Sequence, residues 1–184
     1  MRYKLLTIGQ QLLNRLRFQL LGREFNSCGY GGRICRGFQT NGISQIACGN
    51  GVHLNEGIWI SFNNTSGKLM ISDEVYIGRF CTMSISSSIT IGKNALISDR
   101  VYLGDCNHGY DDKTQPISKQ QVRFGGCVVI GEGSWIGIGV AIMAGVNIGR
   151  NSVVGANSVV TRDVPDYCIV AGNPAKVIRE IQEK

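Results

Sequence analysis

Residues 130–164, IGEGSW-IGIGVA-IMAGVN-IGRNSV-VGANSV-VTRDV, repeat one pattern every six residues. Each hexad opens with a β-branched aliphatic residue, and a small or β-branched residue follows four positions later. Glycine comes directly after the aliphatic residue in four of the six hexads. The opening positions are Ile130, Ile136, Ile142, Ile148, Val154 and Val160, and their partners are Ser134, Val140, Val146, Ser152, Ser158 and Val164.

The same frame extends toward the N-terminus in weaker copies. One copy holds Ile85, Ile91, Ile97 and Leu103, with Ile89, Ala95, Val101 and Asn107 at the partner positions. Earlier copies hold Ile71 and Ile77 with Val75 and Cys81, and then Cys48, Leu54 and Ile60 with Val52 and Ile58. We therefore expect the repeat to occupy residues 26–173.

Strand geometry explains the spacing. Each partner residue stands two positions before the next aliphatic residue, so in a strand both side chains point to the same face. A helix is excluded, because a step of six residues advances about 600° and would scatter the aliphatic side chains around the axis. Three such sides close into an 18-residue triangular coil, and coils stack about 4.8 Å apart. The sequence therefore predicts an all-β solenoid with an aliphatic interior.

Composition agrees with this fold and restricts the partners. The 184 residues allow one domain, and 25 glycines with only 17% charged residues suggest short strands joined by many tight corners. The net charge of +6 suits a polyanion, such as nucleic acid, a membrane surface or a phosphorylated cofactor. Basic residues do not form a stripe interleaved with aromatic residues, which argues against nucleic acid.

The sequence favours a cytoplasmic location. Seven scattered cysteines without a C-x-x-C pair are typical of reduced thiols rather than of a disulfide framework. No apolar run approaches the length of a membrane-spanning helix. Polar residues interrupt any signal-peptide core near the N-terminus, namely Gln10, Gln11, Asn14 and Arg15.

Two terminal segments lie outside the repeat. Residues 1–25 contain an amphipathic basic helix over residues 3–21. This helix either lies on a membrane surface, where it would serve a lipid-linked substrate, or packs on the N-terminal end of the solenoid. In residues 174–184, Pro174 is placed to start a short capping helix over residues 175–182.

His108 stands where the repeat breaks. Continuing the frame from Leu103 puts Asn107 at an inward position and His108 at the next outward one, after which the aliphatic position falls on Gly109. A polar, irregular stretch fills most of residues 105–123, and such a long excursion is uncommon unless it is functional. We therefore predict an outward-facing histidine at the root of a protruding loop.

The hexads resemble those of the hexapeptide-repeat acyltransferases, whose fold is a left-handed parallel β-helix. The run Asp105-Cys106-Asn107-His108-Gly109-Tyr110, with Gln115-Pro116-Ile117, is similar to the active-site loop of O-acetyltransferases of surface-polysaccharide biosynthesis. Three short runs around Gly137, Gly155 and Thr161, and residues 172–179, GNPAKVIR, resemble the sugar and maltose O-acetyltransferases. Together the matching runs extend over residues 71–180.

The resemblance implies an acetyl-CoA-dependent O-acetyltransferase that acts on a sugar of a cell-surface polysaccharide or of its lipid-linked precursor. His108 would be the general base of a direct transfer, because a neutral imidazole can accept the proton of the attacking hydroxyl. Asp105 is the nearest carboxylate to orient the imidazole, with Asp111 and Asp112 behind it, unless Asp105 only shapes the corner. Asn107 and Tyr110 are candidates for binding the acceptor.

Two roles of the implied active site are less well defined. Related sugar acetyltransferases carry an asparagine one coil before the histidine, but residues 81–84 here read CTMS. The oxyanion donor therefore stays open, with a backbone N–H of a neighbouring coil as the simplest choice. Cys106 as a nucleophile would need a base poised on it, so we favour a structural role at the corner.

The resemblance also implies where coenzyme A binds. Its pantetheine arm would lie in a groove between adjacent subunits of a homotrimer, along the backbone near Gly137, Gly155 and Ala156. Trp135 would either line this groove or pack at a subunit contact. Thr161, Lys176 and Arg179 match positions near the nucleotide end, where cations favour phosphates, although Lys176 and Arg179 could equally form a solvated face.

Three alternatives follow from the same residues. The acceptor could be a free sugar, an amino sugar or an antibiotic, or the solenoid could be a non-catalytic scaffold. Zinc enzymes of the carbonic-anhydrase type resemble this repeat but use three histidine ligands. The chain contains only His53 and His108, so we expect no metal site.

Overall fold

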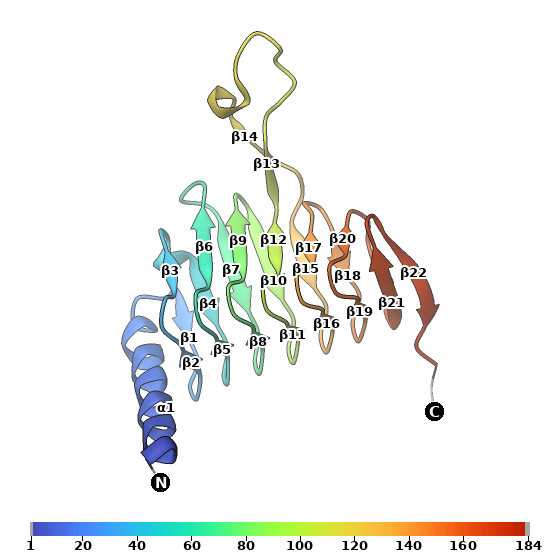
Figure 1. Cartoon of the computed structure of the whole chain (residues 1–184). Coiled ribbons are helices and arrows are strands. Elements are labelled where there is room, and N and C mark those ends of the chain that lie inside the picture. Colours follow the sequence, from blue (N-terminus) through green and yellow to red (C-terminus); the bar gives the residue numbers. More distant parts are fainter. Residues whose placement is uncertain (1, 183–184) are drawn as a thin grey trace.

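The computed structural model describes residues 2–182, and the side chains of residues 8–182. The chain forms a parallel β-solenoid with an N-terminal helix, and its coils stack as a three-sided prism (Figure 1). This architecture agrees with the predicted left-handed β-helix.

Each wall of the prism is a parallel sheet, apart from the antiparallel last strand of sheet B. Sheet A contains β1 (Ser27–Cys28), β4 (Ile46–Cys48), β7 (Lys68–Ile71), β10 (Ser88–Ile91), β15 (Val128–Ile130) and β18 (Asn147–Ile148). Sheet B contains β2 (Arg33–Ile34), β5 (His53–Leu54), β8 (Tyr76–Ile77), β11 (Leu96–Ile97), β16 (Trp135–Ile136), β19 (Val153–Val154), β21 (Cys168–Gly172) and β22 (Ala175–Glu180). Sheet C contains β3 (Gln39–Thr40), β6 (Trp59–Phe62), β9 (Thr82–Ile85), β12 (Tyr102–Gly104), β17 (Ala141–Ile142) and β20 (Val159–Val160).

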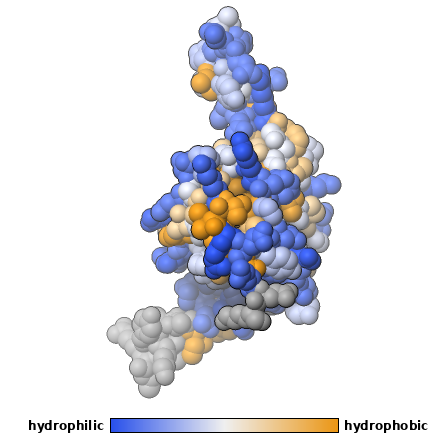
Figure 2. All heavy atoms as spheres, turned by 90° about the vertical axis from the view of Figure 1, so that its right-hand side faces the viewer, coloured by the Kyte–Doolittle hydropathy of each residue, from blue (hydrophilic) through white to orange (hydrophobic). Residues whose placement is uncertain are grey.

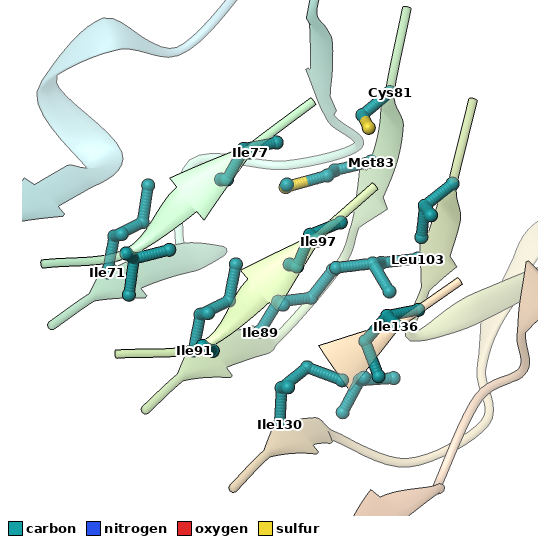
Figure 3. Close-up of a cluster of buried hydrophobic side chains, with 14 of the residues drawn as sticks. Ile71, Ile77, Cys81, Met83, Ile89, Ile91, Ile97, Leu103, Ile130 and Ile136 are labelled. Atoms are coloured by element: carbon teal, nitrogen blue, oxygen red, sulfur yellow. The ribbon is translucent and has the colours of Figure 1, made fainter. Parts of the chain in front are cut away.

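The aliphatic positions of the hexads form the core. In Figure 3 the side chains of three consecutive coils point into the prism, including Ile71, Ile91 and Ile130. Residues at the predicted inward positions are buried in both the strong and the weak copies of the repeat, with Asn107 as an exception. Serine can be buried in this core because its hydroxyl forms a hydrogen bond. Ser134 Oγ, for example, donates to the carbonyl oxygen of Gly149 at 2.7 Å.

The coils of the N-terminal half are longer than the predicted three hexads. Trp135 pairs with Val153 of the next coil, three hexads along the chain, as expected. In contrast, His53 pairs with Tyr76 of the next coil, and Tyr76 pairs with Leu96 of the one after. Each of these two steps is longer than three hexads. The prediction of a uniform 18-residue coil is therefore wrong before Val128, because these coils hold extra residues at their corners.

Several of these extra residues gather at the corner where the chain passes from sheet C to sheet A. The short 3₁₀ helix η1 (Ile43–Gln45), residues 63–67 and residues 86–87 lie at this corner in successive coils. Side chains bond from one coil to the next here, as Gln45 Nε2 donates to the carbonyl oxygens of Asn64 and Gly67. The largest insertion of all follows β12 at the same corner.

The N-terminal helix α1 (Arg2–Leu21) packs on the first coil through a narrow face. Phe18 is 2% exposed and joins the aliphatic core, and Asn14 Nδ2 donates to Cys35 Sγ at 3.1 Å. The second half of the helix thus packs on the N-terminal end of the prism, as one of our two alternatives predicted. Within residues 2–182, no helix combines the length and apolar character needed to cross a bilayer.

The predicted C-terminal helix over residues 175–182 is wrong. Residues 175–180 instead form β22, which pairs antiparallel with β21. Gly172 adopts a φ of +106° and Pro174 follows it, which makes a tight reversal. The backbone groups of β22 thereby pair with the edge of β21, a contact that a helix could not make.

Candidate active site

A protruding arm leaves the prism between β12 and β15 (Figure 1). Its base is an antiparallel hairpin of β13 (Cys106–His108) and β14 (Val122–Phe124), with His108 opposite Val122. The N–H of Gly109 donates to the carbonyl oxygen of Gln121 at 2.9 Å and closes this hairpin. Beyond it, residues 109–121 form a loop that contains η2 (Ile117–Lys119), and mostly hydrophilic residues cover the arm in Figure 2. The predicted loop therefore stands on a paired base.

Asp105 fixes the root of the arm to the preceding coil. Its side chain is fully buried, and its two carboxylate oxygens accept the N–H groups of Ser86 and Ser87, each at 2.7 Å. Both oxygens bond to backbone donors, and among the described residues neither bonds to His108, so Asp105 is not placed as the orienting partner of His108. These contacts agree with the alternative that Asp105 shapes the corner.

The two other candidate carboxylates have partners of their own. Asp111 forms an ion pair with Arg123. Asp112 accepts bonds from the side chains of Thr114 and Gln115 and from the N–H of Thr114, which lowers the pKa of Asp112 to about 2. Among residues 2–182, no hydrogen bond or ion pair joins His108 to a carboxylate.

His108 is exposed, as predicted, and borders a pocket of about 170 Å³. This pocket is lined by Asn63, Ser84, Tyr102, Cys106, Asn107, His108 and Val122. Asn107 is also exposed, which corrects its predicted inward position and keeps it beside the histidine. Tyr110 is 69% exposed in the loop and does not line the pocket. The structure therefore joins His108 with Asn107 and separates Tyr110 from them.

Asn63 and Ser84 are pocket residues that sequence reasoning missed. Asn63 Nδ2 donates to Ser84 Oγ at 3.3 Å and lies 3.1 Å from Cys106 Sγ, while Ser84 Oγ and Cys106 Sγ are 3.4 Å apart. Ser84 pairs in register with Ser61 and Gly104, and Asn63 and Cys106 each follow one of these partners by two residues, so three successive coils supply this column of contacting side chains. A search that allowed coils longer than three hexads would have aligned Ser84 with Ser61 and Gly104, two residues before Asn63 and Cys106.

Cys106 is buried inside this column rather than poised as a nucleophile. Its thiol faces Asn63 and Ser84, and among the described residues no hydrogen bond links it to His108. The half-buried Tyr102 also lines the pocket, where burial, and then the nearby Cys106 and Asp105, raise the pKa of its phenol. A structural role for Cys106 agrees with these contacts.

The arm returns to the prism through two glycines. A Cβ on Gly125 would lie 2.6 Å from the Cβ of Ala144, and one on Gly126 would lie 2.5 Å from the Cα of Gly145. Gly126 also adopts a φ of +117° and accepts the N–H of Gly145 at 2.8 Å. Only glycine allows this close approach, which fixes the second strand of the arm against the next coil.

Three of the predicted coenzyme A positions share one corner of the prism, between sheets B and C. Gly137 donates its N–H to the carbonyl oxygen of Val154, and a Cβ at Gly137 would lie 2.7 Å from the backbone nitrogen of Ala156. Gly155, in turn, stacks on Ala171 of the last coil. These positions form a smooth backbone surface at the edge of sheet C opposite to the His108 arm.

The other predicted coenzyme A residues are spread more widely. Trp135 is 49% exposed on the outer face of sheet B, and its Nε1 donates to Ser98 Oγ at 3.1 Å. Lys176 is exposed opposite Ala171, close to the Gly155 corner, and Arg179 is exposed opposite Ile169. Thr161 is exposed after β20, at the same corner as the arm. Within residues 2–182 there is no group of three metal-ligating side chains.

Comparisons with known proteins agree with the fold and the repeat. Residues 127–162 match the bacterial transferase hexapeptide (six repeats). The chain is 35% identical to the putative lipopolysaccharide biosynthesis O-acetyl transferase WbbJ of Escherichia coli, over 62% of this chain and 61% of WbbJ. It is 34% identical to galactoside O-acetyltransferase of Escherichia coli, over 74% of this chain and 57% of that protein.

A solved structure extends the likeness over most of the chain. The hexapeptide-repeat-containing acetyltransferase VCA0836 of Vibrio cholerae, complexed with acetyl coenzyme A, has a TM-score of 0.66 and 25% identity. The likeness covers 95% of this chain and 87% of that one. The chain spans about half to three fifths of the length of the curated relatives it matches. These likenesses show that the chain contains the hexapeptide repeat of the bacterial transferases and shares the fold of a hexapeptide-repeat-containing acetyltransferase.

Proposed function

We propose that the protein is an acetyl-CoA-dependent O-acetyltransferase whose acceptor is a sugar hydroxyl in a cell-surface polysaccharide or its lipid-linked precursor. The observation that carries the proposal is the exposed His108 at the mouth of a polar pocket, on a hairpin fixed to the prism by Asp105. Support for the donor comes from VCA0836, which was solved with acetyl coenzyme A. Support for the acceptor comes from WbbJ, which is named for lipopolysaccharide biosynthesis.

The proposed reaction is a direct transfer. The acceptor oxygen attacks the thioester carbonyl carbon while His108 takes the hydroxyl proton. The carbon–sulfur bond then breaks, the acetyl ester is formed, and the imidazolium returns the proton to the sulfur of coenzyme A. Because no carboxylate of the described chain bonds to His108, the imidazolium would be stabilised by solvent or by a group of another subunit.

Asn63 fits the amide role for which the sequence offered no candidate. Its Nδ2 already lies within the His108 pocket, next to Ser84 and Cys106. An amide donor at this place would bind either the acceptor or the carbonyl oxygen as it gains charge. Asn107, which lines the same pocket, would add a second polar contact for the sugar.

Coenzyme A would bind along the smooth corner formed by Gly137, Gly155 and Ala156, with its phosphates toward Lys176 and Arg179. This corner and the His108 pocket lie at opposite edges of sheet C. A homotrimer with sites between subunits would bring the two together. Tyr76, Leu96 and Trp135 pair side by side on sheet B and are each at least 40% exposed, which supplies an apolar wall for such a contact.

The decisive test is a coenzyme A release assay with acetyl-CoA over nucleotide-linked and lipid-linked glycans. With the acceptor identified, His108→Ala should lower kcat about 10²- to 10⁴-fold, because general base catalysis supplies a factor of that size. Lys113→Ala, an exposed position on the same arm, should leave kcat unchanged. Near-normal turnover by His108→Ala would refute the assignment of the base.

A second candidate keeps the chemistry and changes the acceptor to a free sugar. The likeness to galactoside O-acetyltransferase favours this alternative. In the same assay it predicts turnover with small soluble sugars and none with lipid-linked glycans. We also propose that the reaction takes place in the cytoplasm, where the seven cysteines, all free in the structure, would remain reduced.

A further inference from the structure

The outer face of α1 is apolar, and no other element among the described residues covers it. Five side chains are each about half exposed or more, namely Ile8, Leu12, Leu13, Leu16 and Leu20. Four of them recur every four residues, so they form one stripe along the helix. Phe18 follows Leu16 by two residues, about 200° around the helix, so the stripe faces away from the first coil on which Phe18 packs.

Basic residues flank the apolar stripe in the helix, Arg15 with an exposed side chain and Arg17 with its guanidinium turned to Asn14 Oδ1 at 2.9 Å. Arg15 and Arg17 stand one residue before and one residue after Leu16, about 100° to either side of it. The helix sequence contains two further basic residues, Arg2 and Lys4, and no acidic residue. An apolar stripe with flanking cations is the arrangement of helices that lie in the interface of an anionic membrane.

A basic cleft adjoins the same helix. Its volume is about 800 Å³, and Arg15, Arg23 and Tyr30 line it together with glycines of the first coil. Neither arginine forms an ion pair among the residues that the structure describes. Two unpaired guanidinium groups at the edge of the stripe are suited to the phosphates of lipid head groups.

We infer that α1 is a membrane-docking helix, which binds the surface of an anionic bilayer through this stripe and the bordering arginines. A second copy of the chain is a poorer occupant, because two such helices would bring their cations together without an acidic residue on either helix to pair them. The buried face, with Asn14 and Phe18, attaches the helix to the prism, so the prism would be held at the membrane.

The placement of α1 sets the distance between bilayer and active site. The helix axis runs across the direction in which the coils stack, at the end of the prism (Figure 1). The His108 arm follows β12, which is three strand spacings, or about 15 Å, beyond β3 of the first coil. A sugar carried on a lipid would reach such a pocket, a consequence that rests on the proposed function, whereas membrane binding itself does not.

The test is co-sedimentation of the full chain with vesicles of phosphatidylcholine alone or mixed with phosphatidylglycerol. The unchanged protein should pellet with the mixed vesicles, and added salt should weaken the binding. The double variant Leu12→Ser/Leu16→Ser should bind at least tenfold more weakly, and Arg15→Gln/Arg23→Gln should lose the preference for anionic lipid. Met70→Ser, a similarly exposed apolar position on β7, should bind as the unchanged protein does.

Two results would overturn the inference. One is equal binding of the unchanged protein and the leucine variant to the mixed vesicles. The other is a change in oligomeric mass of the leucine variant in solution, which would make the stripe a contact between copies of the chain. Melting temperatures and coenzyme A release with a soluble acceptor test whether the variants are folded. A variant that keeps both but no longer binds vesicles concerns the membrane contact alone and not the assignment of the enzyme.

Discussion

The buried carboxylate of Asp105 bonds only to backbone N–H groups, which has a measurable consequence. Asp105→Asn would set an amide NH₂ against one of the two N–H donors of Ser86 and Ser87, and we expect a loss of about 2 kcal/mol in the free energy of unfolding. Urea titration measures this loss. Asp163→Asn is the matched control at the same corner. Asp163 is exposed and accepts one backbone N–H and, at 3.4 Å, the side-chain amide of Asn147, so its replacement should cost much less.

The same variant separates a structural from a catalytic role. An aspartate that orients a catalytic histidine supplies up to about 10⁴ in kcat. If Asp105 only holds the root of the arm, Asp105→Asn should change kcat less than tenfold at a temperature where the protein stays folded. A loss of several thousandfold with unchanged stability would restore Asp105 as the partner of His108.

At single positions, sequence reasoning placed residues well where the hexad frame continued and poorly where it stopped. The frame put Ser134 and Ile136 inward, and both are buried, while Trp135 between them is exposed. The frame put Asn107 inside, because the hexad pattern contains no sign that the chain has already left the prism as a hairpin at this position. Asn63 escaped notice because its neighbours in space are 21 and 43 residues away along the chain.

The arm as an element depends on its return through Gly126. A side chain there meets the Cα of Gly145 at 2.5 Å and must also accept a φ of +117°, so Gly126→Ala should destabilise the protein by about 3 kcal/mol. Gly31→Ala isolates the conformational part of this cost, since Gly31 has a φ of +74° and nothing within 4 Å of its added Cβ. Denaturant titration should find a cost of about 1 kcal/mol for Gly31→Ala.

Proteolysis offers a second measurement on the arm. Gly126→Ala should speed cleavage within residues 109–121, because the strand β14 would no longer be fixed against the following coil. Equal cleavage rates and equal stability of the two glycine variants would contradict the role of Gly126. The sequence alone predicted the loop but not its paired base, since such short strands carry too few side chains to show an alternating pattern.

The C-terminal segment shows why a local signal can mislead. Pro174 followed by Ala175 and Lys176 favours the start of a helix when these residues are read alone. The edge of β21, however, presents unpaired backbone groups that only an extended neighbour can satisfy. Tertiary pairing therefore decides this element, and a reading of the segment in isolation could not include it.

The whole molecule is expected to assemble as a trimer of 20.0 kDa chains, with His108 of one chain facing the Ala156 corner of the next. Co-expression of His108→Ala chains with Ala156→Trp chains tests this. Ala156 is exposed, so the tryptophan should block the groove without unfolding the coil. When the two kinds of chain are present in equal amounts and assemble at random, roughly a quarter of the sites would combine an intact His108 with an intact Ala156 corner.

Activity restored in the mixture, from two variants inactive alone, would establish sites shared between chains. No restored activity in trimers of confirmed mixed composition would place both groups in one chain. Sedimentation velocity gives the oligomeric mass, and a monomer of 20.0 kDa with full activity would contradict the trimer outright.

The corner between sheets C and A, where residues 63, 84 and 106 contact one another, has a consequence for redesign. Three successive coils each contribute one of these side chains, and none of the three belongs to the aliphatic core. The choice of acceptor should therefore be transferable between relatives when the residues at positions 63, 84 and 106 are replaced together with the arm. Residues that lie far apart in an alignment would then have to be swapped as a single cassette.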